Sequence, residues 1–299
     1  MPTALLYNPV AGRGRARAVH ERVLRAARGQ WPDLQVLETR APGDGVVLVR
    51  EAARSGIERL LVVGGDGTVH EAANGILSAG IATLPAIGVV PCGTGNDFAK
   101  MTGTFHCSPE EALRRLARGR VVPFDTGEAW GERFVNSLGI GLDADVAHEL
   151  RTVRRLRGTP AYALALLRTL GKLRPRELEI AVDGETWSGR WTAVVVGNGP
   201  IEGGSFRLTP AARPDDGHLD LCAVAELSLG RLLLLLPTLF WGGHGRFREV
   251  RLRAVTTLSI VSPRRELMAH LDGEIRAPDT DRIDIRIHPA TLPVLVGHR

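Results

Sequence analysis

The stretch from Leu60 to Glu71 constrains the fold of this chain more than any other, because it joins an apolar run to a glycine-rich turn. The four apolar residues at 60–63 indicate a strand buried on both faces, as in a parallel sheet. Glycines at 64, 65 and 67 allow a sharp turn and a close approach of backbone to ligand. Thr68 and Glu71 have the spacing of a capping box, which predicts a helix start and, with its free N–H groups, a phosphate site.

Asp66 is the unusual residue in this stretch. A carboxylate beside a phosphate repels it unless a divalent cation or a donor lies between them. We therefore interpret the stretch as a site for a metal nucleotide.

Two further glycine-containing loops follow strand-like runs, one at residues 8–15 and one at residues 91–99. Taken alone, the first is equally well explained as a solvated loop with a basic helix start. The alternation of strands and helices up to Phe124 indicates a parallel sheet, in which ligands bind at the carboxyl ends of the strands. The three loops are therefore expected to converge on one crevice.

Composition narrows the class of protein. The 299 residues are enough for two domains, and the net charge of +5 fits acidic or phosphate-bearing partners. Aromatic residues make up only 5%, which argues against a base-stacking surface for nucleic acid. Three scattered cysteines and a short apolar start without a signal peptide predict a reduced, cytoplasmic protein.

The second half of the chain, from about Asp125, has a different pattern. Short β-rich runs separated by glycine turns predict an antiparallel sheet or sandwich rather than further β-α units. These runs lie at 133–135, 178–182, 191–196, 219–224, 251–253, 257–261, 268–271 and 282–287, and a last strand is expected at 294–296.

Two segments interrupt this pattern. Residues 151–176 carry eight Lys or Arg and no acidic residue, with apolar residues at helical spacing. A helix packed on the sheet is the commoner explanation, and contact with an anionic membrane surface is the alternative. The apolar run from Leu232 to Trp241 is well below the ~20 residues of a spanning helix, so it is a core helix, an acyl-chain wall or an interfacial segment.

Several motifs together resemble the diacylglycerol kinase and sphingosine kinase type of lipid kinase, especially its soluble bacterial members. They occur in the family's order over nearly the whole chain, at 8–12, 39 with 43–44, 64–68, 91–99, 136 with 141–144, 197–199, 213–217 and 271–274. The resemblance implies an α/β fold with two domains. An N-terminal α/β nucleotide-binding domain like that of phosphofructokinases and NAD kinases would span 1–124. A C-terminal antiparallel β-sandwich domain would span 125–289, with a strand at about 290–299 returning to the first domain.

The resemblance also implies ATP and Mg²⁺ as cofactors, with the nucleotide between the two domains. The residues that it assigns to the nucleotide are Asn8, Pro9, Val10, Ala11, Gly12, Thr39, Gly65, Asp66, Gly67, Thr68, Val69, His70, Glu71 and Thr94. Phosphoryl transfer depends mainly on positioning and charge neutralisation, which glycine-loop amides and Mg²⁺ can supply.

The catalytic residues implied are Glu274, as general base for the acceptor hydroxyl, and Asp66 beside the metal nucleotide. A carboxylate within hydrogen-bond reach can accept the proton that the attacking hydroxyl loses. Without the resemblance, Glu274 is better explained as an exposed turn glutamate.

The metal ligands implied are Asp216 with the carbonyls of Arg213 and His218, and Asp125 is a weaker candidate for support through water. Oxygen ligands suit a hard cation. An ordinary Asp-Gly hairpin turn is the other interpretation of this segment, and the two are compatible, since a bound ion could shape the turn.

Other polar residues carry less weight. No histidine has the spacing of a metal cluster, so surface or core positions are the better interpretation of His70, His148, His218, His244 and His270. Cys92 has no neighbouring base in sequence. Asp143 and the Asn198–Gly199 pair are assigned to turns of the second domain or to the lipid entrance.

The sequence therefore predicts an ATP- and Mg²⁺-dependent lipid kinase that phosphorylates the hydroxyl of a diacylglycerol-like or long-chain lipid. The expected partner is a lipid at a membrane surface, with peripheral contact at its inner face and no nucleic acid. Two alternatives stay open, a kinase of a soluble acceptor such as NAD or a polyol and a non-catalytic lipid- or nucleotide-binding module. The oligomeric state is not determined by the sequence, and a homodimer is left open.

Overall fold

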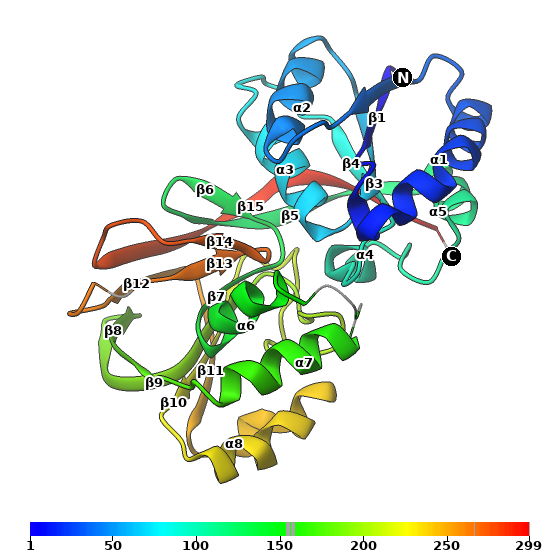
Figure 1. Cartoon of the computed structure of the whole chain (residues 1–299). Coiled ribbons are helices and arrows are strands. Elements are labelled where there is room, and N and C mark those ends of the chain that lie inside the picture. The colour runs from blue at the N-terminus through cyan, green and yellow to red at the C-terminus, as the bar shows by residue number, and fades with distance from the viewer. Residues whose placement is uncertain (154–155, 157–158, 266, 299) are drawn as a thin grey trace. The chain divides into compact units, whose positions relative to one another are not determined.

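The computed structural model describes residues 1–153, 156, 159–265 and 267–298 and divides into two compact units (Figure 1). Unit 1 comprises residues 1–124 and 290–299, and unit 2 comprises residues 125–289. Within the described residues no helix is long and apolar enough to cross a membrane.

Unit 1 is built on a parallel sheet with the strand order β2-β1-β3-β4. Its strands are β1 (Thr3–Tyr7), β2 (Gln35–Glu38), β3 (Arg59–Gly64) and β4 (Ala86–Pro91). The side chains at 60–63 are all 0% exposed, which confirms the prediction of a strand buried on both faces. The end of the last strand, β15 (Arg282–Val296), lies parallel to β4 through Val294 and Ile87.

Helices cover both faces of this sheet. They are α1 (Ala11–Gln30), α2 (Asp44–Arg54), α3 (Asp66–Leu77), α4 (Asp97–Met101) and α5 (Pro109–Ala117). Figure 1 shows α2 and α3 on one face and α1 and α5 on the other. Helix α1 begins at Ala11, so the first loop is shorter than the residues 8–15 that the sequence indicated, and Gly12 and Gly14 adopt positive φ inside the helix.

Unit 2 is a β-sandwich-like domain, as the sequence predicts. Its strands are β6 (Glu132–Phe134), β7 (Ser137–Gly141), β8 (Arg176–Val182), β9 (Glu185–Gly197), β10 (Leu219–Ala225), β11 (Val250–Val255), β12 (Thr257–Val261), β13 (Ala269–Leu271) and β14 (Glu274–Arg276). Strand β5 (Arg120–Ala129) enters this unit from unit 1.

Strand β9 joins the two halves of the sandwich. Its first part pairs with β8, which continues through β12 to β15, and its second part lies between β7 and β10. Every pairing within these halves is antiparallel. Side chains such as Ile180, Val194, Val196 and Ile260 point inward and form the main core.

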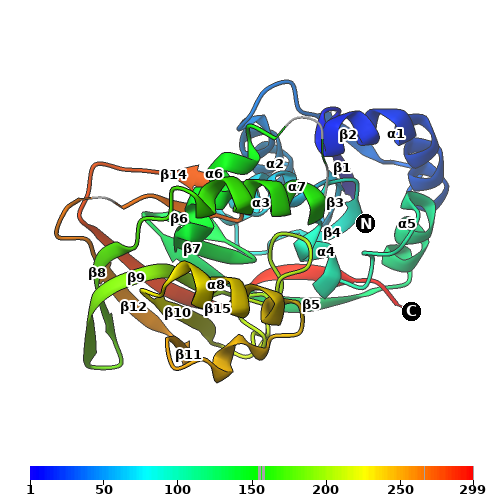
Figure 2. The ribbon, with the colours of Figure 1, turned by 60° about the horizontal axis from the view of Figure 1, so that its bottom comes forward.

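Three helices cover one face of the β7–β9–β10 sheet (Figure 2). They are α6 (Leu142–Leu150), α7 (Thr159–Leu170) and α8 (Leu229–Leu235), and α8 continues into the short 3₁₀ helices η1 (Leu236–Phe240) and η2 (Gly243–Arg246). Helix α6 was not predicted from the sequence. The helix expected within 151–176 is present as α7, although residues 154, 155, 157 and 158 lie outside the described residues.

Candidate functional site

In unit 1, the loops after β1, β3 and β4 touch one another at the carboxyl ends of the strands. A Cβ atom on Gly65 would lie 2.8 Å from the Cα of Gly93, and a Cβ on Gly93 would lie 2.4 Å from the Cα of Gly65. A Cβ on Gly12 would lie 2.0 Å from the carbonyl oxygen of Cys92. The expected convergence of three glycine loops is therefore present. It depends on glycine at these positions, because any side chain there would collide with the neighbouring loop.

Asn8 connects the first of these loops to helix α3. Its Nδ2 donates to Thr68 Oγ1 at 3.1 Å, and its Oδ1 accepts from the Val10 N–H at 3.1 Å. Thr39, at the end of β2, is buried and donates its N–H to the Tyr7 carbonyl. Four neighbouring strand ends therefore carry residues that the family resemblance assigns to the nucleotide.

The predicted capping box at Thr68 and Glu71 is wrong. Helix α3 begins at Asp66, with Gly65 as N-cap and no side-chain cap, so Thr68 already lies inside the first turn. The Glu71 carboxylate instead accepts from the N–H groups of Gly43 and Gly45, both at 2.9 Å. Glu71 thus holds the start of α2 beside α3, which is a structural role that its spacing to Thr68 does not reveal.

The α3 residues differ in what they can offer a ligand. Val69 and His70 are 1% and 3% exposed, and their side chains lie in the core, so only their backbone can face a nucleotide. Gly65, Asp66 and Gly67 are half-buried. Thr94, on the loop after β4, is exposed.

Asp66 is held between two of the loops. Its Oδ1 accepts from the Phe98 N–H at 3.1 Å, and a Cβ on Gly95 would lie 3.0 Å from its Oδ2. The carboxylate therefore lies within the glycine-rich edge of unit 1, where a phosphate would require a cation beside it. Burial raises the pKa of the nearby Cys92 thiol to about 11, with Arg15 opposing the shift, so Cys92 stays protonated.

In unit 2, Glu274 is the first residue of β14 and is exposed. The two residues before it form the turn between β13 and β14, and Asp272 (φ 51°) and Gly273 (φ 87°) have the positive φ of a type I′ turn. The Asp272 carboxylate accepts from the three backbone N–H groups of residues 135–137 at 2.8–3.2 Å. Glu274 is thus presented by a hairpin that is fixed to the start of β7.

The segment that contains Asp216 is not a tight two-residue hairpin turn, because it belongs to a long connection between two strands. It leads into β10 at Leu219, and the strand before it, β9, ends at Gly197. Asp125 holds the segment, because its Oδ2 accepts from the Gly217 N–H at 2.8 Å and its own N–H donates to the Pro214 carbonyl.

Two carboxylates of this segment, those of Asp216 and Asp220, interact electrostatically. Asp216 Oδ1 accepts from the His218 N–H at 3.1 Å. Burial and the charge of Asp216 raise the pKa of Asp220 to about 6, and His218 opposes this shift. Carboxylate oxygens such as those of Asp216 are ligands that suit a hard divalent cation.

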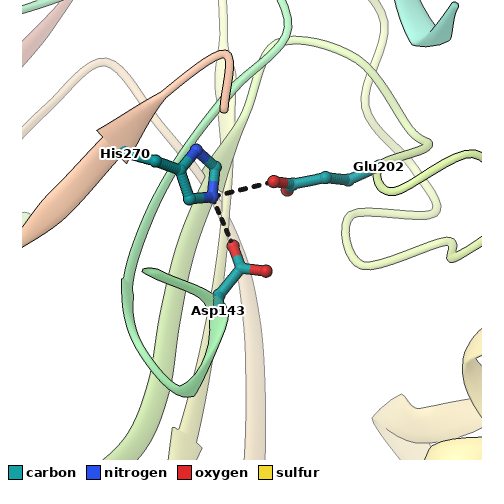
Figure 3. Close-up of side chains that lie close together, drawn as sticks. All are labelled: Asp143, Glu202 and His270. Atoms are coloured by element: carbon teal, nitrogen blue, oxygen red, sulfur yellow. Dashed lines mark hydrogen bonds and ion pairs between the residues drawn. The ribbon is translucent and has the colours of Figure 1, made fainter. Parts of the chain in front are cut away.

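A buried cluster of Asp143, Glu202 and His270 was not predicted (Figure 3). His270 Nε2 lies 2.8 Å from Asp143 Oδ2 and 2.8 Å from Glu202 Oε1. Burial and the charge of Asp143 raise the pKa of Glu202. His270 is thus a core histidine, as expected, but with two acidic partners, and Asp143 lies in helix α6 rather than in a turn.

The hydrogen bonds of His270 favour a proton-holding cluster over a metal centre. The Gly273 N–H donates to His270 Nδ1 at 3.2 Å, and a backbone N–H can only donate. Nε2 therefore carries the ring proton, shares it with the two carboxylates, and has no lone pair for a metal ion. The cluster also restrains Gly273, the residue before Glu274.

An apolar cavity of about 50 Å³ lies beneath helices α6, α7 and α8. Its walls are mainly aliphatic and aromatic, with Leu142, Tyr162, Phe206, Leu232, Leu235 and Leu239 among them. Asp143 contributes the acidic group and accepts from the Tyr162 hydroxyl at 3.2 Å. Burial raises the pKa of the lining Cys222 to about 12 and lowers that of His244, so both are uncharged at neutral pH.

Comparison with known families covers both units. Residues 2–129 match the diacylglycerol kinase catalytic domain, and residues 136–296 match the YegS C-terminal NAD kinase beta sandwich-like domain.

Individual relatives agree with these matches. A YegS-like lipid kinase from Xanthomonas axonopodis pv. citri is 34% identical over 88% of this chain and 89% of its own. A diacylglycerol kinase from Bacillus subtilis is 30% identical over 90% of this chain and 88% of its own. The crystal structure of a diacylglycerol kinase from Bacillus anthracis has the same fold, with a TM-score of 0.73 at 23% identity, and the match covers 99% and 97% of the chains.

Proposed function

Because the chain belongs to the family of diacylglycerol kinases and YegS-like lipid kinases, we propose that it transfers the γ-phosphoryl group of ATP to a lipid hydroxyl. The observation that carries the choice of acceptor is the apolar cavity in unit 2, the unit that also holds Glu274. A diacylglycerol-like or long-chain lipid needs such a cavity for its acyl chain. At about 50 Å³ the cavity is small, so an acyl chain must push its leucine-rich wall outward.

The three touching loops of unit 1 support the nucleotide half of the proposal. Their glycines leave backbone N–H groups accessible at the start of α3, where a phosphate binds favourably. Asp66 is fixed by the Phe98 N–H in the same edge of the sheet, so it would act beside a cation that accompanies the nucleotide. Val69 and His70 would contribute through their backbone only.

A Mg²⁺ ion would be held by Asp216 together with the carbonyls of Arg213 and His218. When bound, it neutralises charge that develops during phosphoryl transfer. Asp125 supports the binding segment directly, because its carboxylate holds the Gly217 N–H.

Glu274 would accept the proton of the attacking lipid hydroxyl. Its carboxylate is exposed and interacts electrostatically with Arg276 on the same strand. The hairpin fixes its backbone through Asp272 and through the His270 contact to Gly273. A rigid backbone with an accessible carboxylate suits a general base.

Purified protein incubated with labelled ATP, Mg²⁺ and lipids in mixed micelles is expected to label a lipid. The panel contains diacylglycerol, phosphatidylglycerol and a sphingoid base, with NAD and glycerol as soluble acceptors. Labelling of NAD alone would contradict the lipid proposal and favour a kinase of a soluble acceptor. Binding of ATP or lipid without any labelled product would favour a non-catalytic module.

The substitution Asp216→Ala is expected to lower activity in a way that raised Mg²⁺ partly restores, because a lost ligand weakens metal affinity. A fall of about 10- to 100-fold at low Mg²⁺ is expected by analogy with other changes around metal sites. The matched control is Asp215→Ala, which removes the neighbouring exposed carboxylate that contacts Arg213. Equal behaviour of the two variants would make this segment a structural turn without a metal.

A further inference from the structure

Helix α8 and η1 expose a concentrated apolar surface. Five large hydrophobic side chains between 229 and 241 are at least half exposed, whereas those elsewhere in the described chain are scattered along the sequence. We call these five residues the α8 surface: Leu229 (50%), Leu233 (51%), Leu234 (64%), Phe240 (50%) and Trp241 (63%). A cluster of this kind in a single segment marks an interaction site.

The opposite side of the same segment lines the apolar cavity. Leu232, Leu235 and Leu239 are nearly completely buried and form part of the cavity wall. The segment therefore has apolar side chains on two sides, and only one of these sides is covered by protein. A helix with two apolar sides is more stable when its exposed apolar side is also buried away from water.

The charges around the α8 surface indicate what covers it. Residues 226–249 contain three arginines, at 231, 246 and 248, and two glutamates, which stand at the two ends of the segment. Arg246 is exposed, and the Arg248 side chain is 90% exposed, although it also pairs with Glu249 at 3.5 Å. Arg231 is held by Glu249 and stacks its guanidinium on Phe247. Apolar side chains beside accessible arginines complement an anionic lipid surface, which offers both acyl chains and negative headgroups.

We propose that the α8 surface docks this protein on an anionic lipid bilayer. In the docked state, the α8 surface is immersed at the boundary of headgroups and acyl chains, and the arginines remain among the headgroups. Helix α8 then separates the bilayer from the cavity by a single layer of leucines. The docking itself does not require the proposed function, but the delivery of an acceptor lipid past α8 rests on it.

The basic segment 151–176 is the competing candidate, and its described residues fit less well. On α7 the exposed large hydrophobic residue is Leu167, at 64%. Arg168 pairs with Glu149 of α6, which offsets its charge. The segment keeps exposed basic residues at 151, 172 and 174, but one leucine buries less apolar surface in a bilayer than the five side chains of the α8 surface.

Sedimentation with vesicles tests the proposal on the full chain. Binding is expected to vesicles of phosphatidylcholine with phosphatidylglycerol and to be weaker without phosphatidylglycerol. The double variant Leu233→Gln/Leu234→Gln changes two exposed side chains and is expected to weaken partition about a hundredfold, since both lose their burial in the bilayer. The matched control, Leu167→Gln on α7, should bind like the unchanged protein.

Trp241 provides an independent readout of the immersed side chain. Vesicles with brominated acyl chains should quench part of the tryptophan fluorescence, and Trp241→Phe should remove that part. Unchanged quenching in Trp241→Phe would overturn the proposal, as would full vesicle binding by the double variant or its loss in Leu167→Gln. Concentration-dependent dimerisation that the double variant abolishes, without vesicle binding by the unchanged protein, would show that a second copy covers the α8 surface instead.

Phosphorylation of a lipid dispersed in detergent micelles separates this proposal from the proposed function. If the double variant loses vesicle binding but keeps micellar activity, docking and catalysis are both supported as distinct steps. If vesicle binding depends on the α8 surface while no lipid is ever phosphorylated, the docking surface stands and the lipid kinase proposal fails.

Discussion

The variant Glu274→Gln is expected to bind ATP normally and to lose about 10²- to 10⁴-fold in turnover, the range typical of a missing general base. Glutamine has nearly the same size but cannot accept the proton of the acceptor hydroxyl. The change should leave the fold intact, because Glu274 is exposed and its place in the hairpin depends on backbone pairing with Leu271. Turnover with a lipid acceptor and equilibrium binding of ATP are the two measurements.

A matched control for this variant is Glu177→Gln, which alters another exposed glutamate at a strand of unit 2. Glu177 pairs with Arg264 on the surface, and such pairs contribute about 0–1 kcal/mol to stability. Glu177→Gln should therefore keep full activity. Undiminished turnover in Glu274→Gln would exclude Glu274 as the base, whereas lost ATP binding would reveal a structural effect.

The architecture of unit 1 follows from local signals in the sequence. Strands β1, β3 and β4 are short apolar runs that end at asparagine, glycine or proline, and they are buried on both faces as that pattern requires. Strand β3 shows this most clearly. The edge strand β2 is the exception, because half of its residues are exposed. The convergence of the loops after β1, β3 and β4 could also be predicted, because parallel strands place their carboxyl ends at one edge.

The incorrect prediction of a capping box shows the limit of local sequence signals. Thr68 and Glu71 have the correct spacing, but the glycine turn lets helix α3 begin two residues earlier, at Asp66. Glu71 then finds better partners in the N–H groups at the start of α2. Spacing alone cannot reveal such a partner, because 26 residues separate Glu71 from Gly45.

The buried cluster of Asp143, Glu202 and His270 could not be predicted either, because its members are even farther apart in the sequence. His270 and Asp143 are 127 residues apart and meet through the pairing of β13 with β7, which leads into α6. One local signal does indicate α6: Leu142, Val146 and Leu150 have the apolar spacing of a helix. A turn was predicted at Asp143 instead. Recognising α6 would have placed Asp143 on a packed element.

The substitution Gly65→Ala is expected to separate the loops after β3 and β4 and to impair the nucleotide site. The backbone of Gly65 (φ −110°, ψ −169°) is one that alanine adopts without strain, so the added methyl acts only through its contact with Gly93. At 2.8 Å from a backbone Cα, that methyl forces one loop to shift. We expect about a 100-fold loss of activity from misplaced phosphate contacts, and about 1–3 kcal/mol less free energy of unfolding.

Gly29→Ala in helix α1 is the matched control, because its Cβ would have no heavy atom within 4 Å. Alanine should stabilise that helix by up to about 1 kcal/mol and leave activity unchanged. Because the clash is mutual, Gly93→Ala should impair ATP binding as Gly65→Ala does, and the double variant should lose less than the sum of the two losses. Strictly additive losses, or full ATP affinity in Gly65→Ala, would show that contact between these two loops does not shape the nucleotide site.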